Sequence, residues 1–211
     1  MNFNFENLSR LRIVPVIVIN DVEKAVPLAK ALCDGGLPCA EVTFRTAAAA
    51  DSIRAITNAF PEMLVGAGTI LSPAQADEAV SAGAKFMVSP GLNPETVKYC
   101  QSKNIPMLPG VCTPSEIELG LSLGLNTLKF FPAEAVGGVN LLKSLTAPYK
   151  NVKFVPTGGI TAANLSNYLA IKNVLACGGS WMVKDELINA GDFAKITELT
   201  REAVALAGRA V

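Results

Sequence analysis

Eight short, apolar, strand-like runs recur along the chain, separated by segments long enough to form helices. They occupy residues 12–19, 39–45, 63–70, 85–91, 105–113, 126–133, 153–160 and 174–181. Regular alternation of strand and helix predicts a parallel sheet, and eight such units can close into a (β/α)8 TIM barrel. We therefore expect the α/β fold class, with residues 1–211 forming a single (β/α)8-barrel domain.

Three of the intervening segments carry signals for the start of a helix. Asn20 with Glu23 predicts a capping box, and Thr113 with Glu116 predicts another. Ser72 is followed by a proline, the pattern of a cap with proline at the first helical position.

Composition excludes several classes of function. The 211 residues include 18 basic and 18 acidic side chains, and this balance, without a basic run, argues against a nucleic-acid partner. The apolar stretch 13–19 is too short to span a bilayer and lacks a secretory cleavage signature, so we expect no membrane partner. The five cysteines are odd in number, scattered and without a Cys-x-x-Cys pair, so we expect no metal site and reduced thiols in a cytoplasmic protein.

Lys129 is a cation inside an otherwise apolar run. A buried ammonium either gains an anionic partner or loses its proton, and a neutral lysine amine attacks carbonyl carbons. Alternation along the strand puts Lys129 and Phe131 toward the barrel lumen, and Leu128 and Phe130 toward the helices. The chain has no histidine, so acid–base chemistry falls to other side chains. Taken alone, Lys129 could equally form a salt bridge to a glutamate.

Polar residues also share one face of the second run. Glu41, Thr43 and Arg45 alternate with the apolar Val42 and Phe44, so the polar set is expected to face the lumen or its mouth. Taken alone, Glu41 and Arg45 could form a merely structural ion pair.

Glycines gather at the ends of three runs. Gly158-Gly159 follows Thr157 after the seventh run, and Gly178-Gly179-Ser180 ends the eighth. Phosphate commonly binds at these two places in such barrels, and diglycines expose backbone N–H groups to an anion. One diglycine alone is more often a tight turn, but two at these positions favour a phosphate site. The small residues of 66–68, before Thr69, would let a ligand approach the backbone.

Together these residues define one chemistry. A lysine amine converts a ketone into a Schiff base, a carboxylate moves protons, and an arginine holds a substrate carboxylate. The sequence therefore predicts a class I aldolase that acts on a 2-oxo acid with a phosphate at its far end.

The chain resembles the family of 2-keto-3-deoxy-6-phosphogluconate (KDPG) and 4-hydroxy-2-oxoglutarate (KHG) aldolases. The matching blocks run in order across nearly the whole chain, at residues 41–46, 66–69, 89–91, 108–110, 128–134, 156–160 and 178–181. The resemblance implies a homotrimeric enzyme without a cofactor that cleaves a phosphorylated 2-oxo sugar acid, KDPG, to pyruvate and glyceraldehyde 3-phosphate. It also implies cleavage of KHG to pyruvate and glyoxylate.

The resemblance further implies residue roles, with Lys129 as the Schiff-base lysine and Glu41 as the general acid/base. The substrate-binding residues that it implies are Arg45 and Thr69 at the pyruvyl carboxylate, Pro90 and Phe131 beside it, Thr157 at the hydroxyl region, and Gly158, Gly159, Gly179 and Ser180 at the phosphate.

Three alternatives stay open from sequence. The first is an aldolase for 2-dehydro-3-deoxy-6-phosphogalactonate, since stereochemistry at C4 depends on placements near Thr157 and Ser180. The second is a sugar-phosphate isomerase or epimerase on the same barrel, although such enzymes usually pair two acid/base groups. The third is a sugar-phosphate-binding barrel without catalysis.

Overall fold

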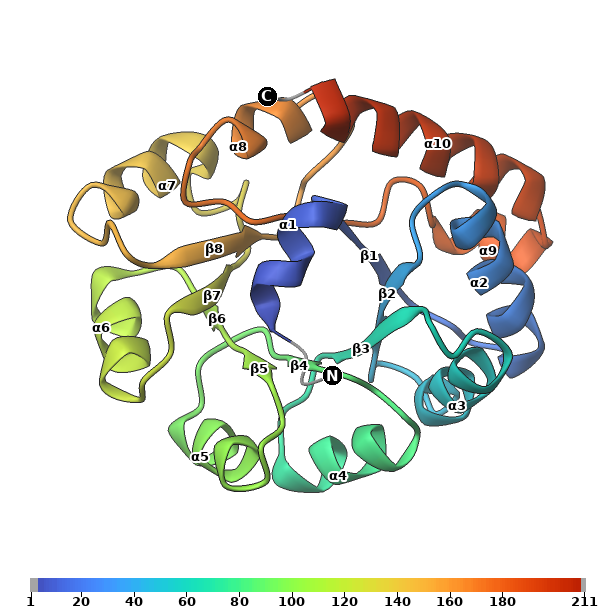
Figure 1. Cartoon of the computed structure of the whole chain (residues 1–211), viewed down its shortest axis with the longest axis horizontal. Coiled ribbons are helices and arrows are strands. Elements are labelled where there is room, and N and C mark those ends of the chain that lie inside the picture. The colour runs from blue at the N-terminus through green and yellow to red at the C-terminus, as the bar shows by residue number, and fades with distance from the viewer. Residues whose placement is uncertain (1–3, 210–211) are drawn as a thin grey trace.

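The computed structural model describes residues 4–209, which form a curled parallel sheet surrounded by helices (Figure 1). Two hydrogen-bonded groups of strands make up the sheet, in the orders β5-β4-β3-β2-β1-β9 and β6-β7-β8. The strands are β1 (Ile13–Ile17), β2 (Cys39–Thr43), β3 (Leu64–Gly68), β4 (Met87–Val88), β5 (Met107–Leu108), β6 (Gly110–Val111), β7 (Thr127–Phe130), β8 (Lys153–Pro156) and β9 (Cys177–Gly179).

Every one of these strands lies inside one of the eight predicted runs, but the fifth run is divided in two at Pro109. Proline has no N–H to donate, so the ladder is interrupted there. The chain also changes partner at this point, since Leu108 pairs with Val88 of β4 and Gly110 pairs with Lys129 of β7. The carbonyl of Pro109 still accepts a hydrogen bond of 2.9 Å from the Lys129 N–H.

The first strand lies beside the last one. Ile13 of β1 pairs with Cys177 of β9. Between β8 and the segment of β9, two isolated bridges join Phe154 to Val174 and Thr157 to Gly178. The sheet is thus curled far enough for its first and last strands to be neighbours.

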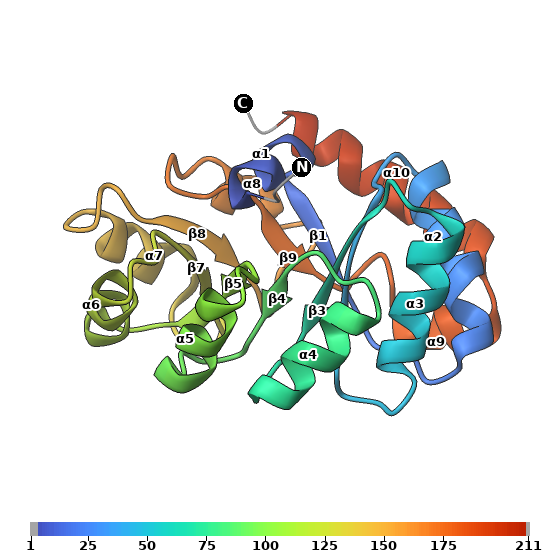
Figure 2. The same ribbon diagram turned by 60° about the horizontal axis from the view of Figure 1, so that its bottom comes forward.

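Helices cover the outside of the sheet, as the turned view shows (Figure 2). The outer helices are η2 (Val22–Lys24), α2 (Ala25–Asp34), α3 (Ala49–Ala59), α4 (Pro73–Ser81), α5 (Pro94–Ser102), α6 (Pro114–Ser122), α7 (Gly138–Thr146), α8 (Leu165–Leu169), α9 (Asp185–Ala190) and α10 (Phe193–Arg209), and the short η1 (Phe5–Asn7) and α1 (Leu8–Leu11) precede the first strand. Within the described residues, none of these helices has the length and apolar character needed to cross a membrane.

Two of the three predicted helix starts are confirmed. Ser72 caps α4 by accepting from the Gln75 N–H, and Thr113 and Glu116 form the capping box of α6. The prediction of Asn20 as a cap is wrong, because the carboxylate of Asp21 accepts the Glu23 N–H instead. Asp is as good a cap as Asn, and the two adjacent candidates could not be separated by type alone.

Two apolar clusters stabilise the fold. The larger one lies between sheet and helices and includes Val42, Leu128 and Phe130, all fully buried. The smaller one fills the inside of the curled sheet, where Leu8 of α1 packs with Phe86 and other side chains from the strands. Helix α1 thus closes one end of the sheet (Figure 1), leaving the other end for a ligand.

Candidate active site

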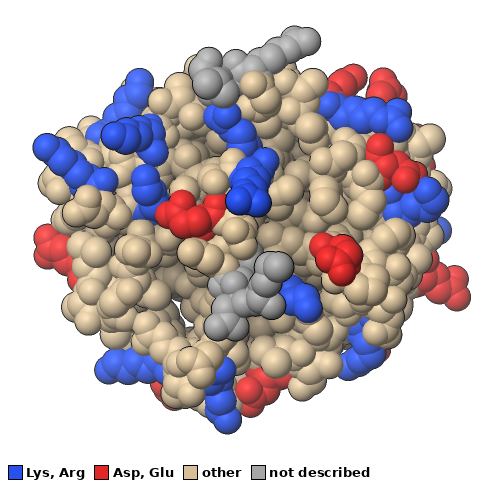
Figure 3. All heavy atoms as spheres, viewed as in Figure 1, with Lys and Arg blue, Asp and Glu red and all other residues tan. Residues whose placement is uncertain are grey.

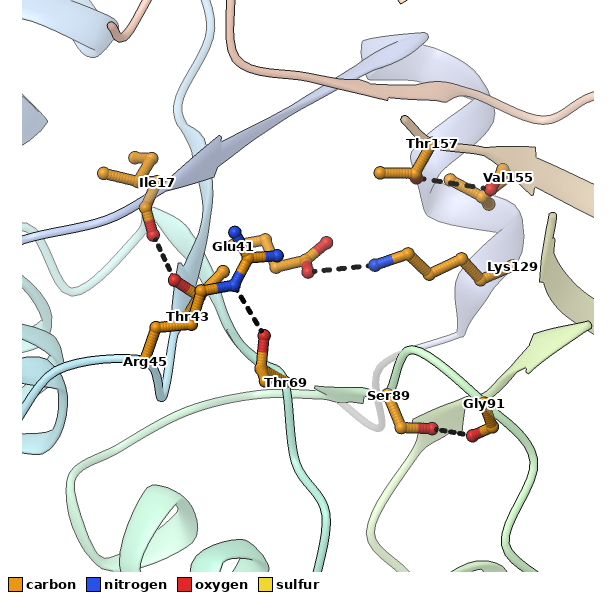
Figure 4. A network of polar contacts seen from close by, with 10 residues as sticks. All are labelled: Ile17, Glu41, Thr43, Arg45, Thr69, Ser89, Gly91, Lys129, Val155 and Thr157. Carbon is orange, nitrogen blue, oxygen red and sulfur yellow. Dashed lines mark hydrogen bonds and ion pairs between the residues drawn. The ribbon is translucent and has the colours of Figure 1, made fainter. Parts of the chain in front are cut away.

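Lys129 and Glu41 meet inside the curled sheet. Lys129 Nζ lies 3.4 Å from Glu41 Oε1, and the two side chains are only 5% and 4% exposed. Figure 4 shows them reaching toward each other from β7 and β2. The predicted lumen position of Lys129 is confirmed, and its ion-pair partner is Glu41. Glu41 therefore makes its ion pair across the sheet, whereas the sequence had suggested Arg45 as one possible partner.

Alternation along β7 explains how Lys129 comes to point inward. Its neighbours Leu128 and Phe130 pack outward, as predicted, and Leu128 lies close to Gly120 of α6. Lys129 Nζ also lies 5.1 Å from the centre of the Phe131 ring, within the range of a cation–π contact. An ammonium here has two sources of attraction, a carboxylate and an aromatic face.

The small residues of β3 make room for neighbouring side chains. A Cβ atom on Gly68 would lie 2.3 Å from Glu41 Oε1, and one on Gly66 would lie 2.3 Å from the Phe86 ring. The expectation that these glycines admit a ligand to the backbone is therefore wrong. Their volume is already taken by Phe86 of the inner cluster and by Glu41.

Arg45 and Thr69 lie together just beyond the ends of β2 and β3. Arg45 Nε donates to Thr69 Oγ1 at 3.3 Å (Figure 4). Thr69 has φ of +59°, a conformation rarely taken by β-branched residues. Such outliers cluster at functional sites, where the surrounding structure holds them. Two residues before Arg45, the Thr43 hydroxyl donates to the Ile17 carbonyl at 2.9 Å, and this hydrogen bond links β2 to β1.

A cavity of about 740 Å³ opens at the carboxyl ends of the strands. Seven of the predicted site residues line it, namely Arg45, Phe131, Thr157, Gly158, Gly159, Gly179 and Ser180. Lys129 and Glu41 are not part of this lining, but Phe131 connects them to it through its contact with Lys129. Thr69 and Pro90 are not among the lining residues, but Thr69 accepts a hydrogen bond from Arg45, which lines the cavity.

The two diglycines differ in structure. Gly158 and Gly159 form a turn with φ of +101° and +78°, conformations that glycine adopts without strain. Gly178 and Gly179, by contrast, form no turn but are the last two residues of strand β9, at the end of the eighth predicted run. They are needed for space, because a Cβ on Gly178 would lie 2.3 Å from Thr157 Oγ1 and one on Gly179 would lie 2.0 Å from the Trp181 ring.

The lining also includes Gly178, which the diglycine pattern contained, and six residues that were missed from the sequence. The missed residues are Val16, Val18, Ile160, Lys184, Asp185 and Glu186. The three charged ones follow β9 by a few residues, so their place after the last strand was an available signal.

On the face that Figure 3 shows, basic and acidic side chains are interspersed over the surface.

Two buried cysteine thiols near the site, Cys39 and Cys177, have raised pKa values. Burial, followed by the charge of Glu41, raises the pKa of the Cys39 thiol, and burial raises the pKa of Cys177. These thiols are therefore protonated and unreactive at neutral pH. Within the part of the chain that the structure describes, no group of three or more His, Cys, Asp or Glu side chains is arranged to hold a metal ion.

A buried lysine amine beside a carboxylate, at the carboxyl-terminal end of a curled parallel sheet, is the arrangement of a Schiff-base aldolase, a carbon–carbon lyase. Comparison with known proteins gives the particular family. The chain belongs to the KDPG and KHG aldolase family, whose family model matches residues 5–199.

Individual relatives agree with this assignment. A KHG/KDPG aldolase of Escherichia coli is 52% identical over 192 residues, which are 91% of this chain and 90% of the relative. A KDPG aldolase of Legionella pneumophila, solved with pyruvate captured as a covalent carbinolamine intermediate, has 42% identity and a TM-score of 0.92, covering 95% of this chain and 98% of that one. A KDPG aldolase of Zymomonas mobilis, solved with 3-phosphoglycerate, has 42% identity and a TM-score of 0.90, covering 98% and 97%.

Proposed function

We propose that this protein is a class I aldolase that cleaves KDPG to pyruvate and D-glyceraldehyde 3-phosphate, and also cleaves KHG to pyruvate and glyoxylate. The observation that carries this function is the buried pair of Lys129 and Glu41, 3.4 Å apart beside a cavity. The relatives support it, since one carries both substrates in its name and another holds pyruvate as a covalent carbinolamine.

Lys129 forms the covalent bond to the substrate. Its neutral amine adds to the C2 carbonyl carbon while the carbonyl oxygen takes up a proton, which gives a carbinolamine. Loss of water then gives the Schiff base. Glu41 is the residue that removes and returns these protons, since its carboxylate is the acid/base group nearest to Nζ.

Cleavage follows from the Schiff base acting as an electron sink. The C4 hydroxyl loses its proton to Glu41 and becomes the aldehyde carbonyl, and the electron pair of the C3–C4 bond moves toward the Schiff-base nitrogen. The resulting enamine takes a proton at C3. Addition of water at C2 then releases pyruvate and restores the Lys129 amine. The water lost when the Schiff base formed is thus returned, and the cycle balances.

The remaining residues bind the substrate. Arg45, held by its hydrogen bond to Thr69, binds the carboxylate of the pyruvyl part, for which the planar guanidinium is suited. Phe131 and Pro90 flank this part, and Thr157 contacts the hydroxyl region. Backbone N–H groups at the Gly158-Gly159 turn, together with Gly179 and Ser180, bind the phosphate at the far end of the cavity.

The other candidate functions are less well supported. The relative and the two solved structures described above are named for the gluconate series, which disfavours a galactonate aldolase. An isomerase or epimerase, or a barrel that only binds, gives no role to a buried lysine beside a carboxylate.

The architecture that we propose is a single domain with a closed eight-stranded barrel. The pairing of β1 with β9 and the two bridges between β8 and the segment of β9 support closure, with the split fifth run joining the two groups of strands. A homotrimer stays a prediction from the family resemblance, and a cytoplasmic location stays a prediction from the sequence.

Reduction with borohydride in the presence of pyruvate tests this function. We expect a reduced pyruvyl group on Lys129, identified by peptide mass mapping, and release of pyruvate from KDPG in an assay coupled to lactate dehydrogenase. Lys129→Met should abolish both signals. Lys153→Met, on the neighbouring strand β8, is the matched control and should retain both. An unmodified Lys129 in the active wild-type protein would exclude the Schiff-base mechanism.

A further inference from the structure

A hydrogen bond between Tyr168 and Glu134 lies directly behind the Gly158-Gly159 turn. The Tyr168 hydroxyl donates to Glu134 Oε1. We propose that Glu134 and Tyr168 are positioning residues that hold this turn with its N–H groups toward the cavity and so set the preference for phosphorylated over unphosphorylated substrate, a role that rests on the aldolase function proposed above.

Each carbonyl group of residues 157–159 accepts a hydrogen bond from a neighbouring segment of the chain. Thr157 O accepts from the Ala133 N–H at 2.8 Å, and Gly158 O accepts from the Glu134 N–H at 3.0 Å. Gly159 O accepts from Asn164 Nδ2 at 3.0 Å. Thr157 also forms a bridge to Gly178 of β9, so the start of the turn is held against that strand. Among residues 4–209, the structure shows no acceptor for the Gly159 N–H, and since Gly159 lines the cavity, this donor is available to an anion.

Glu134 supports the turn through its side chain as well as its backbone. A Cβ atom on Gly159 would lie 2.7 Å from both Cβ and Cγ of Glu134, so the two residues are in close contact. A Cβ on Gly138 would lie 3.0 Å from Glu134 Oε1 and 3.3 Å from the Tyr168 hydroxyl. The Glu134 side chain is thus confined between two glycines and the tyrosine.

Tyr168 is a rigid anchor for this carboxylate. Its side chain is fully buried in the larger apolar cluster. Burial, together with the hydrogen bond to Glu134, raises the pKa of the Tyr168 phenol, so Tyr168 is a neutral donor at neutral pH. The fixed Tyr168 hydroxyl holds the otherwise exposed Glu134 side chain in one orientation. Because the Glu134 backbone N–H donates to the Gly158 carbonyl, an ordered Glu134 also holds the turn in place.

The effect should be confined to the phosphate end of the substrate. Among the described residues, no hydrogen bond or ion pair joins Glu134 or Tyr168 to Lys129 or Glu41. Loosening the turn should therefore weaken binding of KDPG while the Schiff base with pyruvate still forms. KHG, which has no phosphate, should be cleaved almost normally.

The test compares two substrates in four variants. Tyr168→Phe removes only the hydroxyl, and Glu134→Ala removes an exposed side chain whose loss opens no core. Glu134→Gln keeps an acceptor for the Tyr168 hydroxyl. Tyr149→Phe is the matched control, because Tyr149 donates to Glu118 Oε1 at 3.0 Å in an equivalent phenol–carboxylate bond away from the cavity. For each, kcat and KM are measured with KDPG and KHG, and inorganic phosphate is titrated as a competitive inhibitor.

We expect Tyr168→Phe and Glu134→Ala to lower the ratio of kcat/KM for KDPG over KHG by about tenfold, mainly through KM for KDPG, with weaker inhibition by phosphate. Glu134→Gln should restore most of this ratio, and Tyr149→Phe should leave it unchanged. Equal losses on both substrates, or no loss, would overturn the positioning role. Wild-type protein that traps no pyruvate with borohydride would instead refute the proposed function.

Discussion

Lys129 and Glu41 are 88 positions apart in the chain, yet Nζ and Oε1 lie 3.4 Å from each other in a buried site. This distance exceeds the 2.7–2.9 Å typical of strong charge-assisted hydrogen bonds. Each side chain is nevertheless the other's only ion-pair partner among the described residues. The two are therefore coupled in stability as well as in chemistry.

Lys129→Met should destabilise the protein strongly, because it leaves the Glu41 carboxylate buried without its cation. Breaking a buried pair in this way costs about 3–5 kcal/mol. The double variant Lys129→Met/Glu41→Leu should recover much of this loss, since no charge remains. Urea unfolding of the single and double variants measures both effects.

A surface pair provides the control for that measurement. Lys30 Nζ and Asp34 Oδ2 are closer, at 2.7 Å, but their side chains are 65% and 48% exposed. Lys30→Met should change the free energy of unfolding by less than about 1 kcal/mol. A similar cost at Lys30 and Lys129 would show that burial does not govern the pair.

Glu41→Gln should separate Schiff-base formation from turnover. The amide keeps the shape of the side chain but cannot accept a proton, so kcat should fall by roughly 10²–10⁴-fold. Pyruvate should still be trapped on Lys129 by borohydride, but more slowly, because Glu41 also moves the protons of Schiff-base formation. Turnover at the wild-type rate would remove Glu41 from the mechanism.

Arg45→Lys should weaken the binding of both substrates to the same extent, because both carry the same 2-oxo carboxylate. Loss of the planar guanidinium should raise KM by about tenfold for KDPG and for KHG. Arg54→Lys is the control, since Arg54 pairs with Asp51 on the surface of α3. An effect on KDPG alone would place Arg45 at the phosphate instead.

Gly159→Ala should selectively impair cleavage of KDPG. Alanine would be strained at φ of +78°, and its Cβ would lie 2.7 Å from Glu134. Gly124→Ala isolates the first effect, because Gly124 has φ of +77° with no atom within 4 Å of the added Cβ. We expect about 1–2 kcal/mol of destabilisation at Gly124 without a change in substrate preference. If both variants behaved alike, contact with Glu134 would have no part in the phosphate site.

Glu116→Gln should remove a pH-dependent contribution to stability. Burial acts to raise the Glu116 pKa, but hydrogen bonds from the Cys112 and Thr113 N–H groups and the Thr113 hydroxyl outweigh it, and the pKa is lowered from 4.5. A carboxyl with a lowered pKa in the folded state contributes stability above its unfolded pKa and loses it as pH falls through the folded value. The stability difference between wild type and Glu116→Gln, measured by urea unfolding, should therefore be constant from pH 7 to about 5 and shrink below pH 4.5. A difference that grew on acidification would contradict this.

Strand alternation made the centre of the site predictable. It placed Lys129 inward and Leu128 outward because the period of two is fixed by backbone geometry. The positions of all the strands followed from apolar runs. Their number did not, because the break at Pro109 depends on a change of hydrogen-bonding partner between distant strands.

Sequence could not show which glycines serve a ligand and which serve packing. Gly68 and Gly178 are small because Glu41 and Thr157 occupy the adjacent space, and that space exists only in the folded sheet. The hydrogen bond between Glu134 and Tyr168 was invisible for the same reason. Its partners are 34 positions apart and share no local pattern.

The pairing of β1 with β9 has a consequence for how the protein is made. A ribosome delivers Ile13 long before Cys177, its partner in the sheet. Until then one edge of β1 is an unpaired template, open to association with other chains. Contacts between such distant segments also slow folding, because a long loop must close first. A chain shortened by its last few dozen residues would carry Lys129 and Glu41 but keep that edge permanently exposed, so aggregation should precede any measurable catalysis.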